Sequence, residues 1–512
     1  MKKVFLGFIL SAIFWMMLAG TGAAEELIIS KGITTGADYV TLQSLSQANK
    51  KAAMEDIKEA LEGFKESVSV SKYNLTPAEA GDLYLETVYE NPQLFYVKTA
   101  WAHSTFPATP DKAEQLIFIG EDESKEKVLY SYAEYIDSPV AFAERKEKIE
   151  AELHRILAIV NKDMTDAEKA LAVHDWFVQH YQYNYAASLT SALCEAHRID
   201  GLFIDKTAVC QGYALGYQYV MQKLGIPSKY LPSESMGHAW NLLKIGDAWY
   251  HVDVTYDDPV YDGEDIFGYV SHDCFLRSDA GIQAEDHNGW SLPDGVNEVS
   301  STDFGGEDRF WANLTTGAQY LDGEWYYKKS DSIVKRGFKD ESEKKVKRVS
   351  QTYFDIGIYE GRIYYNTLQD VRSIKPDGTD ERIVWTPTLS KNTEIYKMLL
   401  LGDTIYIGTA KEYDLILDRQ KGITLVDNIS FIAEVEDGQV VITMTGRTDK
   451  DGMFALSIKD GKTQDAFTCI PLAHGHELFK IDIPTSTQKE VTVYAWSGLM
   501  PLAKPVTISL EE

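Results

Sequence analysis

A cysteine, a histidine and an aspartate follow one another along this chain at spacings that could assemble a nucleophile with its base. Cys210 lies in AVCQGYA (208–214), where a helical pattern begins directly after an apolar pair. A cysteine in the first turn of a helix lies at the positive end of the helix dipole, which favours the nucleophilic thiolate. The N–H groups of that turn can also hold a developing oxyanion. We therefore predict that Cys210 is a nucleophile, with a buried structural thiol as the alternative.

A predicted β-hairpin supplies the base and the residue that orients it. The segments HAWNLLKI (238–245) and AWYHVDV (248–254) have the composition of strands, and a two-residue Gly-Asp loop joins them. The turn is centred between positions 246 and 247, whose sum is 493. Position i on one strand therefore faces position 493 − i on the other. His238 then lies near position 255, within two residues of Asp253. The spacing alone predicts that an imidazole and a carboxylate meet.

Local signals predict the helices that position this site. Thr165 and Glu168 form a capping box, after which apolar residues recur at helical spacing. His174 lies on that apolar face, where a histidine is more often a satisfied core residue than a catalytic one. A second helix is predicted to run from Cys210 to a stop at Gly225.

Three motifs carry a resemblance to a known family. AVCQGYA, GHAWNLL and WYHVDVTYDDP are similar, in this order and at these spacings, to the transglutaminase-like superfamily, and in particular to its bacterial secreted branch of cysteine proteases. The flanking segments ENPQLFYV, AVHDWF and FLRSD…HNGW resemble the family as well, so that the likeness covers about residues 60–290. A lone HAWN would be weak, whereas the ordered set is specific.

The resemblance implies an α+β fold with a papain-like cysteine proteinase core, the nucleophile on a helix and the other two residues on a sheet. It implies that Cys210 is the nucleophile, His238 the base and Asp253 the residue that orients the base. Two positions depart from the family pattern. Tyr256 replaces a common tryptophan, and Asp200 stands where an aromatic residue is expected on the substrate side.

The chemistry of such a triad is attack on a protein or peptide amide through a thioester, with no cofactor and no metal. Water as acceptor gives a protease or amidase, and an amine gives a cross-linking transglutaminase. A catalytically idle, cell-surface binding module is the alternative from another class. Other hypotheses are a metal site made of His238, His251 and Asp253, and calcium or lysine binding by Asp257 and Asp258, for which a turn is the simpler interpretation.

Beyond about residue 305 the sequence predicts short aromatic strands and no catalytic residue. Similar segments around Trp325, Ile363, Ile405 and Val440 are offset by 38, 42 and 35 residues, near the period of propeller blades or stacked hairpins. The predicted regions are a signal peptide (1–24), an N-terminal α/β region (25–150), a transglutaminase-like core (151–304), a propeller-like β-repeat (305–425) and a β-sandwich-like end (426–512).

Composition limits the location and the partners of the chain. Lys and Arg number 50 and Asp and Glu 78, so the net charge is −28, which disfavours nucleic acid and anionic lipid. Four cysteines without a CxxC pair exclude a disulfide scaffold and a zinc ribbon. A charged start, an apolar run and small residues predict a signal peptide. We expect a secreted or cell-envelope protein with a protein or peptide substrate and no stable membrane span after cleavage.

Overall fold

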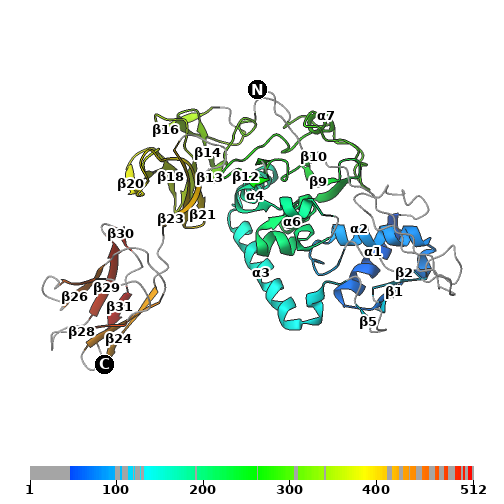
Figure 1. The fold of residues 1–512 in the computed structure, drawn as a ribbon, viewed down its shortest axis with the longest axis horizontal. Helices are drawn as coiled ribbons and strands as arrows, with labels where there is room; N and C mark the ends of the chain where they lie inside the picture. The colour runs from blue at the N-terminus through cyan, green and yellow to red at the C-terminus, as the bar shows by residue number, and fades with distance from the viewer. Residues whose placement is uncertain are drawn as a thin grey trace. The chain divides into compact units, whose positions relative to one another are not determined.

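The computed structural model describes residues 47–98, 104–105, 114–118, 120–121, 127–128, 132–190, 193–261, 263–304, 309–339, 342–411, 418–425, 430–436, 439–445, 453–459, 467–471, 478–482, 490–497, 500–501 and 506–509 (Figure 1). The predicted signal peptide lies outside these residues. The chain divides into two compact units, Met1–Ser138 and Pro139–Glu512. Among the helices in the described residues, none is long and apolar enough to cross a membrane.

The first unit combines two packed helices with small antiparallel sheets. A capping box between Thr76 and Glu79, with Pro77 at the first helical position, starts its second helix. Three strands form one sheet in the order β1-β3-β2, and a two-stranded hairpin forms another. The elements are α1 (Gln47–Glu62), β1 (Ser67–Ser69), α2 (Pro77–Glu90), β2 (Ser104–Thr105), β3 (Gln115–Ile117), β4 (Gly120–Glu121) and β5 (Lys127–Val128).

The second unit opens with helices that pack on a three-stranded antiparallel sheet of order β10-β9-β8. Helix α6 contacts both β8 and β9 (Figure 1). The main elements are α3 (Pro139–Ala158), α4 (Asp166–His180), α6 (Cys210–Lys223), β8 (Ser228–Ser233), β9 (His238–Ile245) and β10 (Ala248–Val252). Shorter ones are β6 (Gln182–Tyr183), α5 (Tyr185–Ser188), β7 (Thr207–Ala208), β11 (Val260–Tyr261), β12 (Glu264–Asp265) and α7 (Asp279–Gln283). Helix α3 runs through residue 150, where the sequence suggested a boundary.

The start of α4 and the end of α6 have the local chemistry that the sequence predicts. Thr165 and Glu168 make the capping box of α4. Gly225 follows the C-cap of α6, Leu224, with a φ of +76°, and the N–H groups of Gly225 and Ile226 donate to the carbonyls of Gln222 and Met221. This is the Schellman arrangement, which needs a residue that tolerates the left-handed region.

Three antiparallel meanders follow, and they explain the weak repeat. Each meander has a tight hairpin between its first two strands. The second strand of each has a fully buried residue, which is Trp325, Ile363 or Ile405 in turn. Apolar side chains of neighbouring sheets pack together. The strands are β13 (Gln319–Leu321), β14 (Glu324–Lys329), β15 (Ser332–Arg336), β16 (Lys344–Arg348); β17 (Ile356–Tyr359), β18 (Arg362–Asn366), β19 (Val371–Ile374), β20 (Arg382–Trp385); β21 (Glu394–Leu401), β22 (Thr404–Ala410) and β23 (Asp418–Thr424).

The fourth segment of the repeat, around Val440, does not continue the meanders. Its strand β25 pairs with β24 and with the distant β28, and a second sheet has the order β27-β26-β29-β30 with β31 beside β29. These strands are β24 (Ser430–Glu436), β25 (Gln439–Thr445), β26 (Met453–Lys459), β27 (Phe467–Pro471), β28 (Leu478–Asp482), β29 (Glu490–Ser497), β30 (Met500–Pro501) and β31 (Val506–Ser509). Every described element after α7 is therefore a strand, as predicted for the C-terminal half.

Candidate active site

Cys210 is the first residue of α6, as its sequence context predicts. Val209 caps the helix in an extended conformation, and the first intrahelical hydrogen bond runs from Tyr213 N to Val209 O at 3.1 Å. The N–H of Cys210 lies ahead of that bond, at the positive end of the dipole. The side chain is partly exposed, and its thiol is not in a disulfide.

Gly212 lies two residues after the cysteine, where the start of α6 meets the segment that precedes it. A Cβ at this position would lie 2.5 Å from Ala196 O and 2.8 Å from Ala208 Cβ. The absence of a side chain therefore lets the start of α6 pack against the chain's own backbone. Val209 N donates to the same Ala196 carbonyl at 3.0 Å. Glycine at this position thus fixes the place of the cysteine.

His238 begins β9 and lies between the cysteine and the carboxylate. Its Nε2 is 2.5 Å from Asp253 Oδ2, and its side chain is 10% exposed. With Nε2 engaged there, Nδ1 is the ring nitrogen that remains for Cys210. Burial alone would lower the pKa of His238, but the charges of Asp253 and Cys210 and hydrogen bonds to both raise it to about 10. The ring is therefore held as an imidazolium at neutral pH.

Asp253 follows the end of β10, and the hairpin has the predicted register. Ala248 pairs with Ile245 and Val252 with Asn241, each pair summing to 493. Asp253 Oδ1 accepts hydrogen bonds from the backbone N–H groups of Thr255 at 3.0 Å and Tyr256 at 3.1 Å. Burial opposes ionisation, yet the charge of His238 and its hydrogen bond lower the pKa of Asp253. The structure thus brings all three predicted residues together.

Sequence reasoning missed a second histidine on the same carboxylate. His287 is 1% exposed, and its Nε2 lies 2.8 Å from Asp253 Oδ2, the oxygen that His238 also contacts. The ring of Tyr256 packs on both histidines, with centroid distances of 4.9 Å to His238 and 4.4 Å to His287. The HNGW segment that resembled a family flank was the available signal, because it contains this histidine.

Trp240 and Asn241 support the site from the interior of β9. The Trp240 ring stacks on His238 with a centroid distance of 5.7 Å, and its Nε1–H donates to His251 Nδ1 at 2.9 Å. Asn241 Nδ2 donates to Ala214 O at 3.0 Å and so joins the strand to α6. The helix that carries the cysteine and the strand that carries the histidine are therefore fastened together one turn away from the sulfur.

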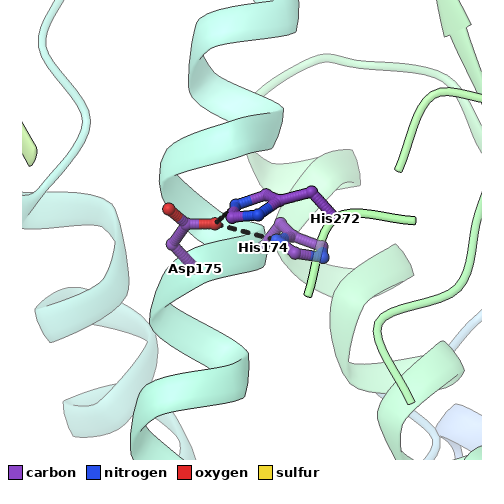
Figure 2. A group of neighbouring side chains, drawn as sticks. All are labelled: His174, Asp175 and His272. Atoms are coloured by element: carbon purple, nitrogen blue, oxygen red, sulfur yellow. Dashed lines mark hydrogen bonds and ion pairs between the residues drawn. The ribbon is translucent and has the colours of Figure 1, made fainter. Parts of the chain in front are cut away.

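A separate buried cluster of two histidines and two aspartates includes two neighbouring residues of α4, His174 and Asp175. Figure 2 shows Asp175 facing the neighbouring rings of His174 and His272, with Oδ1 2.9 Å from His174 Nδ1 and 2.8 Å from His272 Nε2. The other nitrogen of His174 is 3.0 Å from Asp257 Oδ2. Burial lowers the pKa of His174, but hydrogen bonds and charges from Asp175 and Asp257 raise it to about 9. His174 is thus the satisfied core histidine that the sequence predicts.

Two of the alternatives for this region are wrong. The proposed metal group of His238, His251 and Asp253 does not assemble, because His251 Nε2 instead contacts Asp279 Oδ1 at 2.8 Å. Asp257 and Asp258 do not face solvent, where they could attract calcium or a lysine. Asp257 is fully buried on His174, and Asp258 accepts from Tyr213 Oη at 2.6 Å.

Two groups of described side chains bring three nitrogen or oxygen atoms within 4.8 Å of one another: His174, Asp175 and His272, and His238, Asp253 and His287. On tetrahedral zinc, with bonds of about 2.0–2.1 Å, neighbouring ligand atoms lie roughly 3.3 Å apart. The measured contacts of 2.9 and 2.8 Å in the first group and 2.5 and 2.8 Å in the second are shorter. As they stand, both groups are hydrogen-bonded networks.

Asp200 also has a structural role, in place of the expected aromatic wall. Its side chain is fully buried and accepts from Arg145 Nη2 at 2.7 Å and from Arg198 Nε at 3.0 Å. These ion pairs fasten α3 to the segment before the nucleophile helix. Because the carboxylate is enclosed by two guanidinium groups, the position contributes charge pairing to the core and no apolar surface for a substrate.

Comparison with known proteins agrees with the motifs. Residues 155–254, which include Cys210, His238 and Asp253, match the Transglutaminase-like superfamily. A crystal structure of a TGase is 14% identical, with a TM-score of 0.20, 30% of this chain covered and 44% of that chain. The extracellular domain of the hybrid two component system BT4673 from B. thetaiotaomicron is 11% identical, with a TM-score of 0.18, 53% of this chain covered and 42% of that one.

The chain thus spans less than half the length of either solved structure, and both TM-scores are too low to show a shared fold. Comparison with curated proteins finds no match. The family match rests on the sequence and the hairpin register on the geometry. Both concern residues between 155 and 254. The predicted resemblance is confirmed: residues 155–254 of this chain match the Transglutaminase-like superfamily.

Proposed function

We propose that this protein is a cysteine-dependent acyl-transfer enzyme that hydrolyses protein or peptide amides. One observation carries the proposal. His238 is bonded through Nε2 to a buried carboxylate, Asp253, and its charge is further stabilised by Cys210 at the start of a helix. A cationic imidazole beside a cysteine keeps the sulfur as a thiolate, the form that attacks carbonyl carbons.

The reaction would proceed in two halves. In the first, the Cys210 thiolate adds to the amide carbonyl carbon, and the N–H groups at the start of α6 stabilise the oxyanion. The C–N bond then breaks, and His238 gives its proton to the leaving amine, which leaves a thioester. In the second, His238 takes a proton from water, hydroxide oxygen bonds to the acyl carbon, and the C–S bond breaks. The carboxylic acid leaves, and the thiolate–imidazolium pair is restored.

Hydrolysis is the outcome that we favour over cross-linking. A cross-linking enzyme must attract an amine as the second acceptor, and an acidic surface near the thiolate would attract a lysine side chain. The two acidic residues nearest in sequence, Asp257 and Asp258, are instead buried on His174 and Tyr213. Water needs no such surface. This argument supports a protease or amidase, with a transglutaminase as the second candidate.

We also propose that the core is papain-like and that the protein acts outside the cell or at the cell envelope. The nucleophile begins a helix, α6, that packs on the antiparallel sheet carrying the histidine. The N-terminal sequence, with its charged start, apolar run and small residues, supports export. A catalytically idle binding module is the alternative, supported by the long β-rich C-terminal half, and it predicts an unreactive Cys210.

A glutamine-rich protein incubated with a labelled primary amine separates the candidates. Hydrolysis predicts peptide cleavage, or ammonia release without uptake of the label, and loss of both in Cys210→Ala. Label incorporation that depends on Cys210 would show a transglutaminase. Failure to turn over any amide, together with an unreactive Cys210, would favour the idle module. Cys194→Ala is the matched control, because Cys194 is also an unpaired, partly exposed thiol.

A further inference from the structure

His287 makes two hydrogen bonds that define the charge of its ring. Nε2 lies 2.8 Å from Asp253 Oδ2, and Nδ1 lies 2.9 Å from the backbone carbonyl of Glu285. A carbonyl and a carboxylate can only accept. Both contacts are therefore hydrogen bonds only if both ring nitrogens carry a proton, which makes His287 an imidazolium. The ring is buried, so water does not provide another partner for either nitrogen.

The segment that carries His287 is fastened to the strand beside the candidate base. Ser233 Oγ donates to Asn288 O at 2.6 Å, and Ser233 forms a backbone bridge with Trp290. Ser233 is also the residue that pairs with His238 across β8 and β9. The position of His287 is thus set relative to His238 through a single strand residue.

Gly289 makes this close fit possible. Its φ is +71°, and a Cβ there would lie 1.9 Å from Ser235 Oγ. The positive φ favours glycine here, and any other residue would also require the Ser235 side chain to move aside. The fit fixes the backbone on the C-terminal side of His287, while its own hydrogen bond to Glu285 fixes the ring from the other side.

We propose that His287 is a positioning residue of the Cys210 site, a second imidazolium that holds Asp253 on His238 and balances the charge of the buried carboxylate. The inference rests on the function proposed above. A triad of thiolate, imidazolium and carboxylate has one uncompensated negative charge. With His287 the set contains two anions and two cations. Burying an unbalanced charge is costly, so the fourth group lets Asp253 stay ionised away from water.

The charged and titratable groups around the His287 ring are few. Asp253 and His238 face it on the triad side, and the Tyr256 ring packs on it at 4.4 Å. Burial lowers the pKa of His251, the hydrogen bond and charge of Asp279 oppose that shift, and the charge of His287 adds to it. The adjoining residues in the chain are Glu285 and Asp286. Among the carboxylates in the described part of the chain, Asp253 alone is bonded to a nitrogen of the ring.

The test compares His287→Gln, which keeps a donor toward Asp253 and removes the charge, with His287→Leu, which removes both. Two readouts are taken on the full chain. The first is the ¹⁵N chemical shifts of the His287 ring near about pH 7, assigned by their loss in His287→Gln; we expect both nitrogens to be protonated. The second is the rate of Cys210 alkylation by iodoacetamide against pH, followed by peptide mass spectrometry.

Removing a cation makes the thiolate harder to form. Asp253 would lose one of its two cationic partners and its charge would oppose the thiolate more strongly, so we expect His287→Gln to move the inflection of the alkylation rate upward by about one pH unit. His287→Leu should in addition lower the plateau rate about tenfold, because the lost hydrogen bond lets Asp253 move. Thermal unfolding checks that each variant is folded.

Three results would overturn the proposal. One is a bare ring nitrogen on His287. Another is an inflection in His287→Gln at the wild-type pH. The third is an equal loss of rate at every pH in both variants, which marks a purely structural role. Should wild-type Cys210 show no selective reactivity, the proposed function falls, whereas the ¹⁵N shifts of His287 still decide the charge of its ring.

Discussion

Replacing Asp253 by asparagine measures how far the carboxylate controls the charge of His238. The substitution keeps the size of the side chain and removes its charge. The pKa of His238 is raised from 6.5 to about 10, and at about 1.4 kcal/mol per unit this corresponds to roughly 5 kcal/mol in favour of the imidazolium. Because the side chain is only 10% exposed, solvent screens little of this.

Asp253 is the largest of the influences that raise this pKa, ahead of Cys210. Losing at least half of the roughly 5 kcal/mol would lower the pKa of His238 by about two units or more. The pKa of His238 would then be about 8 or lower, and above that pH the sulfur would lose its cationic partner. An ordinary cysteine titrates near about 8.5, so the alkylation of Cys210 in Asp253→Asn should follow that behaviour.

The assay is the pH dependence of Cys210 alkylation, scored by its inflection because the plateau rate also depends on nucleophilicity. We expect an inflection well below about 8 in the wild type and near about 8.5 in Asp253→Asn. Thr255→Ala is the matched control, because its backbone N–H still donates to Asp253 Oδ1. An unchanged inflection in Asp253→Asn would refute the claim that this carboxylate charges His238.

Three further outcomes are expected. Asp257→Asn should lower the free energy of unfolding by about 3 kcal/mol near about pH 6. The pKa of His174 is about 9 in the fold against 6.5 unfolded. The protonated ring therefore stabilises the fold fully below pH 6.5, and this stabilisation is lost as the pH rises through 9. In urea unfolding, the difference in free energy between Asp257→Asn and the wild type should accordingly shrink toward about pH 9. Gly212→Ala should abolish selective alkylation of Cys210 because a Cβ meets backbone at 2.5 Å, whereas Gly216→Ala, which meets a movable leucine side chain at 2.3 Å, should keep it at reduced thermal stability. A chain ending at Leu425 should keep the alkylation rate of the full chain, and a loss in a folded product would assign the last strands to the site.

The part of the site that local chemistry determines could be predicted from the sequence. A two-residue turn fixes the register of a hairpin, so Asp253 had to lie near His238. A helix start has a recognisable composition, and so has a Schellman end at Gly225. These features depend on neighbours within a few residues, and no distant contact can shift them without breaking several hydrogen bonds.

The remaining features depend on long-range packing. The contact between His287 and Asp253 joins residues 34 apart, and that between His174 and Asp257 joins residues 83 apart. No periodicity or turn rule brings such pairs together. The same reason explains why the sequence did not reveal the partner of Asp200 on helix α3, Arg145, or the burial of Asp257 on His174. The segment around Val440 repeats a hairpin motif, but its strand partner, β28, is set by the fold of the last sheets.

The first meander and the residue just before it are linked to helix α4 by hydrogen bonds. Trp325 Nε1 donates to Glu168 Oε1 at 3.0 Å, and Ala318 N donates to Asp175 Oδ2 at 2.7 Å. Both acceptors lie on α4. A chain ending near residue 304 would leave these buried carboxylate oxygens without their donors, which carries a cost of about 1–3 kcal/mol for each. The first meander is therefore part of what stabilises the helix beneath the site.

The central claim, that Cys210 is activated by His238, is tested most directly by competitive alkylation of the cysteines within one chain. Cys194 is an internal control because it also has a histidine beside it, with Sγ 3.7 Å from His197 Nδ1. Burial lowers the pKa of His197, whereas the pKa of His238 is raised to about 10, so only Cys210 has a cationic partner at neutral pH. Limiting iodoacetamide near about pH 6.5 should label Cys210 at least about tenfold faster than Cys194, and His238→Ala should remove that preference. Equal labelling of the two cysteines in the wild type, or a preference for Cys210 that persists in His238→Ala, would contradict the account.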